Sequence, residues 1–214
     1  MKRLRLLIAI LALTAAGSTA KAQFVKFSFG IEGGGLGTYM QTDPGLYPAF
    51  GYGGYGGANF ELRLGRVIGF YVEGIYSYQT GNHNLLKEGG YDTGFKVNLT
   101  RQYIHIPVSL HLWMGRSAIF EVGFQQSILM NSRYTEDPDS YYPTVISPDE
   151  GALKYYTSLI AGFKFNMGRV VYLNIRGTYG LSPSYVIWGN GFPVITASVG
   201  LGFRLYTYRR SAFK

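Results

Sequence analysis

The most informative stretch of the chain runs from Tyr103 to Gln125 and reads YIHIPVSLHLWMGRSAIFEVGFQ. In its first half, large apolar residues from Ile104 to Leu112 alternate one by one with residues that are mostly polar. The same alternation resumes at Phe120. A period of two is typical of a strand whose two faces meet different surroundings. Because a Gly-Arg pair separates the two halves, the stretch predicts an antiparallel hairpin with a short turn.

This alternation recurs along the rest of the chain. It predicts eight strands, in the ranges 25–32, 52–64, 68–79, 95–112, 120–128, 155–166, 171–179 and 195–205. Within the fourth range, Phe95, Val97 and Leu99 have the opposite parity to Ile104 and the apolar residues that follow it. A change of parity inside a strand indicates one extra residue, so we expect a β-bulge near Arg101.

The connections between these strands alternate between short and long. Short turns are expected at Gly65-Arg66, Gly115-Arg116 and Gly168-Arg169, and long connections at about residues 36–49, 80–94, 131–153 and 181–193. Short turns on one rim and long loops on the other are typical of a transmembrane β-barrel, with the turns periplasmic and the loops extracellular. The expected fold is therefore all-β, an eight-stranded antiparallel transmembrane β-barrel.

Composition excludes several other classes of protein. The length of 214 residues suits one domain, and 14 Phe with 19 Tyr are too many for a disordered polymer. The absence of cysteine excludes a disulfide scaffold and a zinc site with Cys ligands. Charged residues make up 15% of the chain, against a usual ~25%. Part of the surface is therefore expected to face lipid rather than water.

Residues 1–22 have the pattern of a secretory signal peptide. A basic start at Lys2–Arg5 precedes the apolar run Leu6–Ala16, and Ala20–Ala22 forms a small-x-small cleavage site ahead of Gln23. Four of the 20 Lys and Arg lie in this segment, so 16 basic and 12 acidic residues remain, spread along the chain. We therefore expect no nucleic-acid partner. Later apolar runs are too short for a membrane-spanning helix. The expected division is a signal peptide at 1–22, a barrel at 23–208 and a basic tail at 209–214.

The distribution of charge supports a membrane barrel independently. Four of the 12 acidic residues fall on the polar faces of the strands, eight fall in the long connections, and none falls on an apolar face. A lipid-facing charge at the bilayer midplane is costly, about 2–4 kcal/mol for Lys or Arg. A soluble, lipocalin-like barrel would alternate too, but about one charge per strand is sparse for a face exposed to water. The predicted lumen charge network consists of Glu32, Glu61, Arg63, Glu73, Glu121, Lys164, Arg176 and Arg204.

Three stretches, Tyr103–His111, Leu173–Leu181 and Ser198–Leu205, read YIHIPVSLH, LNIRGTYGL and SVGLGFRL. They resemble strands of the small outer-membrane barrels of the Bacteroidota, the porin-family or PorT-like group. In that group the fourth strand usually reads Tyr-x-Glu-Ile-Pro, then apolar residues and Lys. Here His105 and His111 stand in place of that Glu and that Lys. These motifs are strand patterns, so the resemblance implies a fold and a location but no chemistry.

The resemblance implies insertion in the outer membrane, with outer-membrane lipids, lipopolysaccharide and the barrel-assembly machinery as partners. Gly200, Phe203 and Leu205 have the spacing of an assembly signal in the last strand. The group includes PorT, a component of the type IX secretion pathway. A periplasmic or secretion-complex partner is therefore a further expectation.

Three groups of residues resemble known nucleotide-binding or metal-binding motifs. Gly51, Gly53 and Gly56 spell the dinucleotide-binding pattern, but a strand follows them instead of the helix that this motif requires. His105 and His111 share a strand face but lie about 20 Å apart, so they cannot hold one metal and are expected to form hydrogen bonds in the lumen. The acidic residues Asp137, Asp139, Asp149 and Glu150 lack the spacing of a calcium loop. No catalytic, cofactor or metal residues are expected, and we expect no enzyme.

Three classes of function remain open. The favoured one is a barrel with a lumen filled by side chains and a structural or partner-binding role. The alternatives are a passive porin and an outer-membrane lipid-modifying enzyme. One further feature concerns partners, because basic residues without acidic ones gather at the expected periplasmic rim: Arg66, Arg116, Arg169, Arg209, Arg210 and Lys214. They would either anchor the barrel to lipid phosphates or dock an acidic periplasmic partner.

Overall fold

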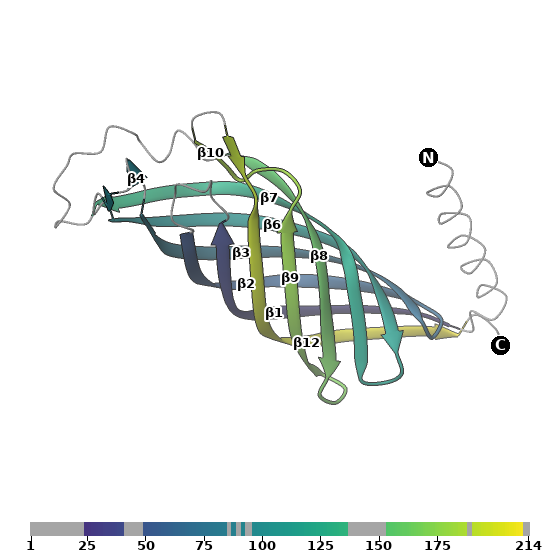
Figure 1. Ribbon diagram of the computed structural model, residues 1–214. Coiled ribbons are helices and arrows are strands. Elements are labelled where there is room, and N and C mark those ends of the chain that lie inside the picture. Colours follow the sequence, from purple (N-terminus) through teal and green to yellow (C-terminus); the bar gives the residue numbers. More distant parts are fainter. Residues whose placement is uncertain are drawn as a thin grey trace, which may run out of the picture.

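The computed structural model describes residues 24–40, 49–84, 87–88, 91–92, 96–136, 153–187 and 190–211. They form a closed antiparallel barrel of eight strands (Figure 1). In chain order the strands are β1 (Phe24–Met40), β2 (Ala49–Leu64), β3 (Ile68–Asn84), β6 (Lys96–Met114), β7 (Ala118–Glu136), β8 (Tyr155–Asn166), β9 (Val171–Gly180) and β12 (Val194–Ser211). Pairing of β1 with β12 closes the barrel. The predicted fold class is confirmed.

Two small hairpins lie in the long connections. They are β4 (Lys87–Glu88) with β5 (Tyr91–Asp92), and β10 (Tyr185–Ile187) with β11 (Asn190–Phe192). In the described part of the chain, no helix is long and apolar enough to cross a bilayer. The expected signal peptide at 1–22 lies outside the described residues.

The alternation of side chains along each strand separates an apolar outer face from a polar inner face. Along β8 and β9 the inner residues are buried and the outer ones are mostly exposed, with a period of two. The exposed positions carry large apolar side chains such as Phe124, Phe163 and Val199. The buried positions carry mostly polar and charged groups. This is inverted relative to a soluble domain, whose charges face water and whose apolar groups fill the core.

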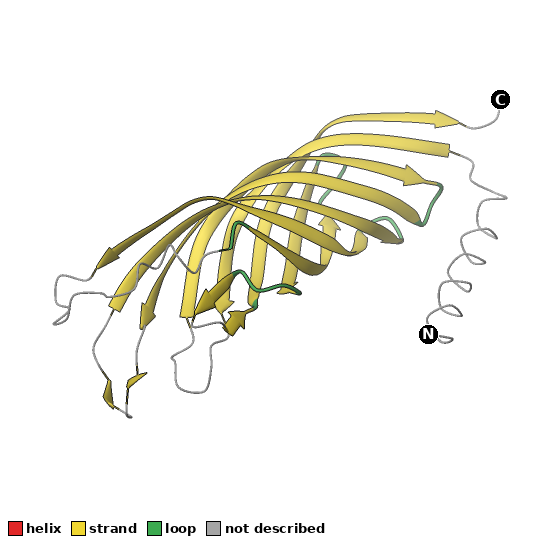
Figure 2. Ribbon diagram, turned by 90° about the horizontal axis from the view of Figure 1, so that it is seen from above, coloured by secondary structure: helices red, strands yellow, loops and turns green. Residues whose placement is uncertain are grey.

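The three short turns occur at the predicted Gly-Arg pairs. Gly65, Gly115 and Gly168 have φ angles of 68°, 77° and 106°. Residues with a Cβ atom adopt this left-handed region at a steric cost, which accounts for glycine at the same place in each turn. These turns and the start of β1 lie at one end of the barrel, which we call the turn rim; the long connections lie at the opposite end, the loop rim (Figures 1 and 2).

The structure corrects three details of the predicted strands. The register shift near Arg101 exists, but the extra residue is Met130 on β7, since Gln102 pairs with Asn131 and Tyr103 with Leu129. A second shift makes Leu205 the extra residue on β12, opposite Phe29 and Gly30 on β1. Several strands are also longer than predicted: β1 ends at 40, β3 at 84 and β7 at 136, and β12 continues to 211, beyond the predicted strand end at 205 and the predicted barrel end at 208.

A closed ladder of hydrogen bonds predicts resistance to detergent. Unboiled protein in sodium dodecyl sulfate is expected to migrate differently from boiled protein, because a barrel has almost no open strand edge at which unfolding can start. Gel electrophoresis of the mature chain with and without boiling measures this. Identical mobility of the two samples would contradict a closed, detergent-resistant barrel.

Candidate functional site

The inner face of the barrel carries a cluster of buried charges that meet near its middle. Arg176, on β9, is 3% exposed, and Lys164, on β8, is 2% exposed. The carboxylates come from β1, β2, β3 and β7 and belong to Glu32, Glu61, Glu73 and Glu121, all buried. Each stands at an inner position of its strand because of the alternation described above. We call these six residues together with His111 the lumen cluster.

Arg176 links two carboxylates across the lumen. Its Nη2 lies 2.9 Å from Oε2 of Glu73 and 3.1 Å from Oε1 of Glu121. Ser109 also donates a hydrogen bond of 2.8 Å to Oε1 of Glu121. Such charge-assisted hydrogen bonds are short and strong, and they fix the geometry of the groups that they join. Three strands on different sides of the barrel are thereby connected through its interior.

Lys164 is held by charge and by an aromatic ring. Its Nζ lies 3.8 Å from Oε2 of Glu32, 3.9 Å from Oε2 of Glu121 and 3.4 Å from the centre of the Tyr71 ring. Glu32 in turn accepts hydrogen bonds from the Tyr55 hydroxyl, at 3.1 Å, and from Asn174. A desolvated ammonium over a ring face gains cation–π energy in addition to its attraction to the carboxylates.

The two lumen histidines have different surroundings. Nδ1 of His111 lies 3.0 Å from Glu61, and the imidazole stacks on Tyr71. His105 lies 2.8 Å from the Ser77 hydroxyl and 2.7 Å from the Ser127 hydroxyl. The sequence predicted hydrogen bonding for both, but it did not place His111 among the charges. Within the described residues, no group of three or more His, Cys, Asp or Glu is arranged to hold a metal ion.

Two members of the predicted network lie nearer the turn rim. The Arg63 guanidinium lies 3.7 Å from the centre of the Trp113 ring. The Arg204 guanidinium lies 5.8 Å from the same ring and donates a hydrogen bond to Asn166. The structure thus divides the predicted network into the lumen cluster and a basic group at the turn rim.

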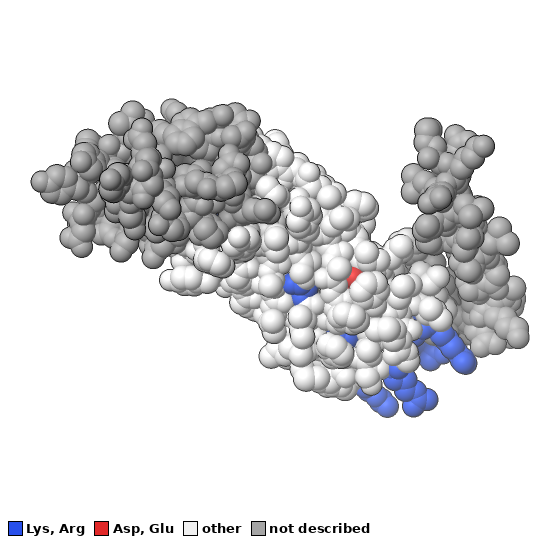
Figure 3. All heavy atoms as spheres, viewed as in Figure 1, with Lys and Arg blue, Asp and Glu red and all other residues white. Residues whose placement is uncertain are grey.

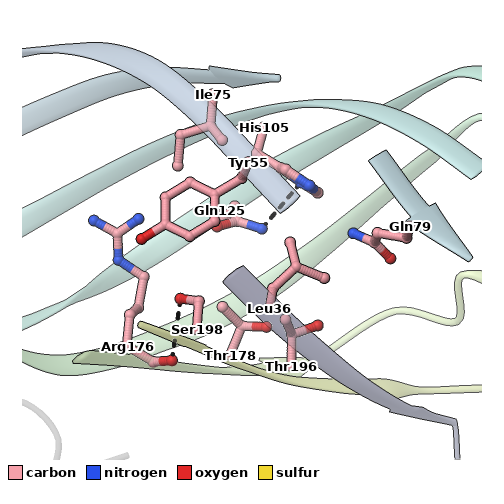
Figure 4. A pocket seen from close by; sticks show the side chains of 10 residues that line it. All are labelled: Leu36, Tyr55, Ile75, Gln79, His105, Gln125, Arg176, Thr178, Thr196 and Ser198. Carbon is pink, nitrogen blue, oxygen red and sulfur yellow. Dashed lines mark hydrogen bonds between the residues drawn. The ribbon is translucent and has the colours of Figure 1, made fainter. Parts of the chain in front are cut away.

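A small cavity of about 30 Å³ lies on the loop side of Arg176 (Figure 4). Tyr55, Gln125 and His105 project into this region together with Arg176. The volume suits water molecules rather than an organic ligand, because one water needs at least about 10–15 Å³ measured in this way.

The remaining predicted residues that the structure describes lie at the turn rim and in the last strand. Arg66, Arg116 and Arg169 are exposed in the three turns, and Arg209 is exposed on β12; Lys and Arg gather at this end in Figure 3. The side chain of Arg210 and the whole of Lys214 lie outside the described residues.

The predicted assembly signal has structural roles of its own. A Cβ atom on Gly200 would lie 2.2 Å from the Tyr55 hydroxyl, so glycine there leaves room for that ring. Phe203 faces outward, and Leu205 is the bulge residue.

The glycine pattern that resembles a dinucleotide-binding motif lies in an ordinary β-strand. Gly51, Gly53 and Gly56 lie within the uninterrupted strand β2, with no helix after it. At Gly53 a Cβ atom would lie 2.0 Å from the Tyr78 carbonyl oxygen, so close approach of β2 and β3 requires glycine. The acidic residues at 137, 139, 149 and 150 lie outside the described residues.

Comparisons with known proteins agree with this architecture. A family described as outer membrane protein beta-barrel domain matches residues 19–186. Neisserial surface protein A has 12% sequence identity and a TM-score of 0.50, with 84% of this chain and 99% of that protein covered. The Ail protein of Yersinia pestis has 12% sequence identity and a TM-score of 0.45, with 84% of this chain and 98% of that protein covered. OprG of Pseudomonas aeruginosa has 11% sequence identity and a TM-score of 0.41, with 90% of this chain and 98% of that protein covered. No curated protein matches the chain.

Proposed function

We propose a function for this chain from the premise that it belongs to the outer membrane protein β-barrel domain family. It is a small outer-membrane β-barrel protein. Its proposed role is structural or partner-binding, with a lumen that side chains keep closed. In this proposal the signal peptide at 1–22 is removed during export, the turn rim faces the periplasm and the loop rim faces outward.

The observation that carries this proposal is the lumen cluster. Arg176 and Lys164 connect carboxylates from β1, β3 and β7 across the interior, and both cations are almost fully buried. An eight-stranded barrel is just wide enough for its own side chains to fill it. A solute would have to break several buried ion pairs to pass, at a cost of about 3–5 kcal/mol for each pair that loses a partner. The geometry therefore supports a closed barrel over a passive porin.

Reconstitution in planar bilayers tests the closed lumen. The purified wild-type protein is expected to give no sustained ion conductance of porin size, because the lumen cluster blocks the path. Insertion is verified on the same preparation by its mobility on a gel before boiling. Steady conductance from inserted wild-type protein would refute the closed lumen and favour the porin alternative.

One observation bears on the alternative of a lipid-modifying enzyme, namely the hydrogen bond between Ser77 and His105. A nucleophilic serine needs an activating base and access to substrate. Here Ser77 and Ser127 are both 0% exposed, and the second ring nitrogen of His105 is occupied by Ser127 rather than by a carboxylate. This pair therefore supports internal hydrogen bonding and not catalysis.

Within the family we further propose a place among the PorT-like barrels of the Bacteroidota. The support is the resemblance of the fourth, seventh and last strands described above, together with the basic turn rim. A role as a PorT-like component of protein secretion would require a periplasmic partner.

A further inference from the structure

The outer face of the barrel changes its chemistry near the loop rim. Directly paired residues on β3, β6, β7 and β8 form a row across this face, namely Tyr76, Ile104, Ile128 and Tyr155. Between this row and the turn rim, the outer positions carry large apolar side chains such as Val108 and Phe124. Aromatic side chains form a girdle where a transmembrane barrel leaves the hydrocarbon. We therefore take this row as the outer boundary of the lipid chains on this side of the barrel.

Strands β6 and β7 continue beyond this boundary toward the loop rim. β8 begins at Tyr155, opposite Ile128, whereas β7 runs on to Glu136. On the other side of β7, β6 begins as early as Lys96 and stays paired with it. Figure 1 shows β6 and β7 extending further toward the loop rim than β8. The barrel therefore has a taller wall on this side.

The outer positions of this wall are polar instead of apolar. Gln102 and Thr100 lie two and four residues before Ile104, so they share its outer face. Their partners on β7 are Asn131 and Arg133, and directly opposed residues share a face as well. Among the described residues, the side chains of Gln102, Asn131 and Arg133 make no hydrogen bond or ion pair, and none of the three is buried. Their donors and acceptors are thus available to whatever surrounds the wall.

A glutamine within the apolar region behaves differently. Gln126 lies on the outer face, two residues from Ile128 toward the turn rim. Its Oε1 accepts a hydrogen bond of 2.9 Å from the Thr157 hydroxyl, and its Nε2 donates one of 3.2 Å to the Tyr156 carbonyl. Polar groups among lipid chains need partners within the protein, because hydrocarbon offers none. The amides beyond the boundary lack such partners, which indicates that their surroundings supply the hydrogen bonds.

The height of the wall indicates which surroundings these are. Thr100 and its partner Arg133 lie about 14 Å along the strand from Ile104 at ~3.4 Å per residue, or about 10 Å in height at a tilt of about 45°. Phospholipid head groups occupy only about 5–8 Å on each side of the hydrocarbon. Arg133 therefore faces the layer beyond such head groups. In the outer leaflet of an outer membrane, this layer consists of the core saccharide of lipopolysaccharide.

We propose that Gln102, Asn131 and Arg133, here called the saccharide face, bind the core saccharide of lipopolysaccharide. Amide and guanidinium groups donate hydrogen bonds to sugar oxygens, and a guanidinium also pairs with the phosphates that such saccharides carry. The saccharide face continues the outer surface that contacts lipid chains, so one lipid lies along the barrel from its chains to its sugars. This inference names a partner for the proposed partner-binding role and rests on the outward orientation of the loop rim.

Side-chain amide signals in nuclear magnetic resonance test the contact on the wild-type mature protein. The barrel is placed in nanodiscs of phosphatidylcholine containing phosphatidylglycerol, lipid A without core sugars, or lipopolysaccharide with core sugars. The signals of Gln102 and Asn131, assigned from Gln102→Leu and Asn131→Leu, are expected to shift only with the core sugars. Gln126 is the matched control, and its signal is expected to stay in place because its amide is bonded within the barrel. Equal shifts in all three discs, or none with lipopolysaccharide, would overturn the proposal.

Removal of the polar groups measures their contribution to binding. The combined variant Gln102→Leu, Asn131→Leu and Arg133→Leu is expected to retain lipopolysaccharide about tenfold less, or lower still, because three sets of hydrogen bonds are lost. Native mass spectrometry after extraction in detergent measures the retained lipid. The control variant Gln126→Leu with Arg116→Leu makes matching changes outside the saccharide face and is expected to stay within about twofold of wild type. Equal losses in the two variants would refute a specific face.

Arg133→Gln separates recognition of sugars from attraction to phosphate. This variant loses the charge but keeps an amide that bonds sugar hydroxyls, so its retention of lipopolysaccharide is expected to fall only about twofold to threefold. A loss as large as that of the combined variant would show that charge alone holds the lipid, and the proposal would fail. The conductance test needs no lipopolysaccharide, so a closed barrel without saccharide contact refutes only this inference.

Discussion

Arg176→Ala is expected to lower the free energy of unfolding by about 3–5 kcal/mol, because it leaves buried carboxylates without their partner. The guanidinium is 3% exposed and contacts Glu73 and Glu121, both of which are buried. Without Arg176, Glu121 would keep Lys164, His111 and the Ser109 hydroxyl as neighbours, whereas Glu73 would lose the ion pair that it forms among the described residues. Urea titration of the barrel folded into lipid vesicles, followed by tryptophan fluorescence, measures the change.

Two comparisons show whether the loss arises from the lumen cluster. Arg116→Ala removes the same side chain from an exposed turn and is expected to change stability by less than about 0.5 kcal/mol. Arg176→Met combined with Glu73→Gln and Glu121→Gln removes the charges together and is expected to recover much of the loss, since replacing a whole buried ionic group is often close to neutral. Equal destabilisation by Arg176→Ala, Arg116→Ala and the loop change Asp139→Ala would contradict a lumen network.

The strands were predictable from the sequence because their signal is local. A residue at an outer strand position faces an apolar environment, and a residue at an inner position faces a polar one. The alternation of apolar and polar residues can therefore be read directly from the sequence. The bulges were less predictable for the same reason. The parity change in the range 95–112 pointed to Arg101, whereas the extra residue is Met130 on the partner strand. One strand alone does not show which of two partners carries the additional residue.

The candidate site was predictable as a set of residues but not as a set of contacts. Parity along each strand places Glu73, Glu121 and Arg176 on the inner face. Whether they meet depends on how far the strands are staggered around the barrel, and stagger is a property of the closed sheet rather than of any strand. The place of His111 between Glu61 and Glu121 follows from the same stagger. The extension of β12 beyond Phe203, past the first residue of β9 at Val171, also required the register.

Ile175→Arg is expected to destabilise the barrel by about 2–4 kcal/mol in lipid vesicles, because it places a charge on the outer face near the middle of the bilayer. Ile175 precedes Arg176 on β9, points outward with 43% exposure, and pairs with Val199 and Phe163, which are also outward and exposed. Adjacent residues on one strand would thus respond to arginine in opposite ways, since Arg176 stabilises the lumen and arginine at 175 would enter hydrocarbon.

Ile175→Ala controls for lost packing, and Leu64→Arg, on the outer face at the turn rim, is expected to cost only about 0–1 kcal/mol. Urea unfolding in vesicles measures all three variants. If Ile175→Arg cost no more than Leu64→Arg, the outer face would be in water and the barrel would be of the soluble kind.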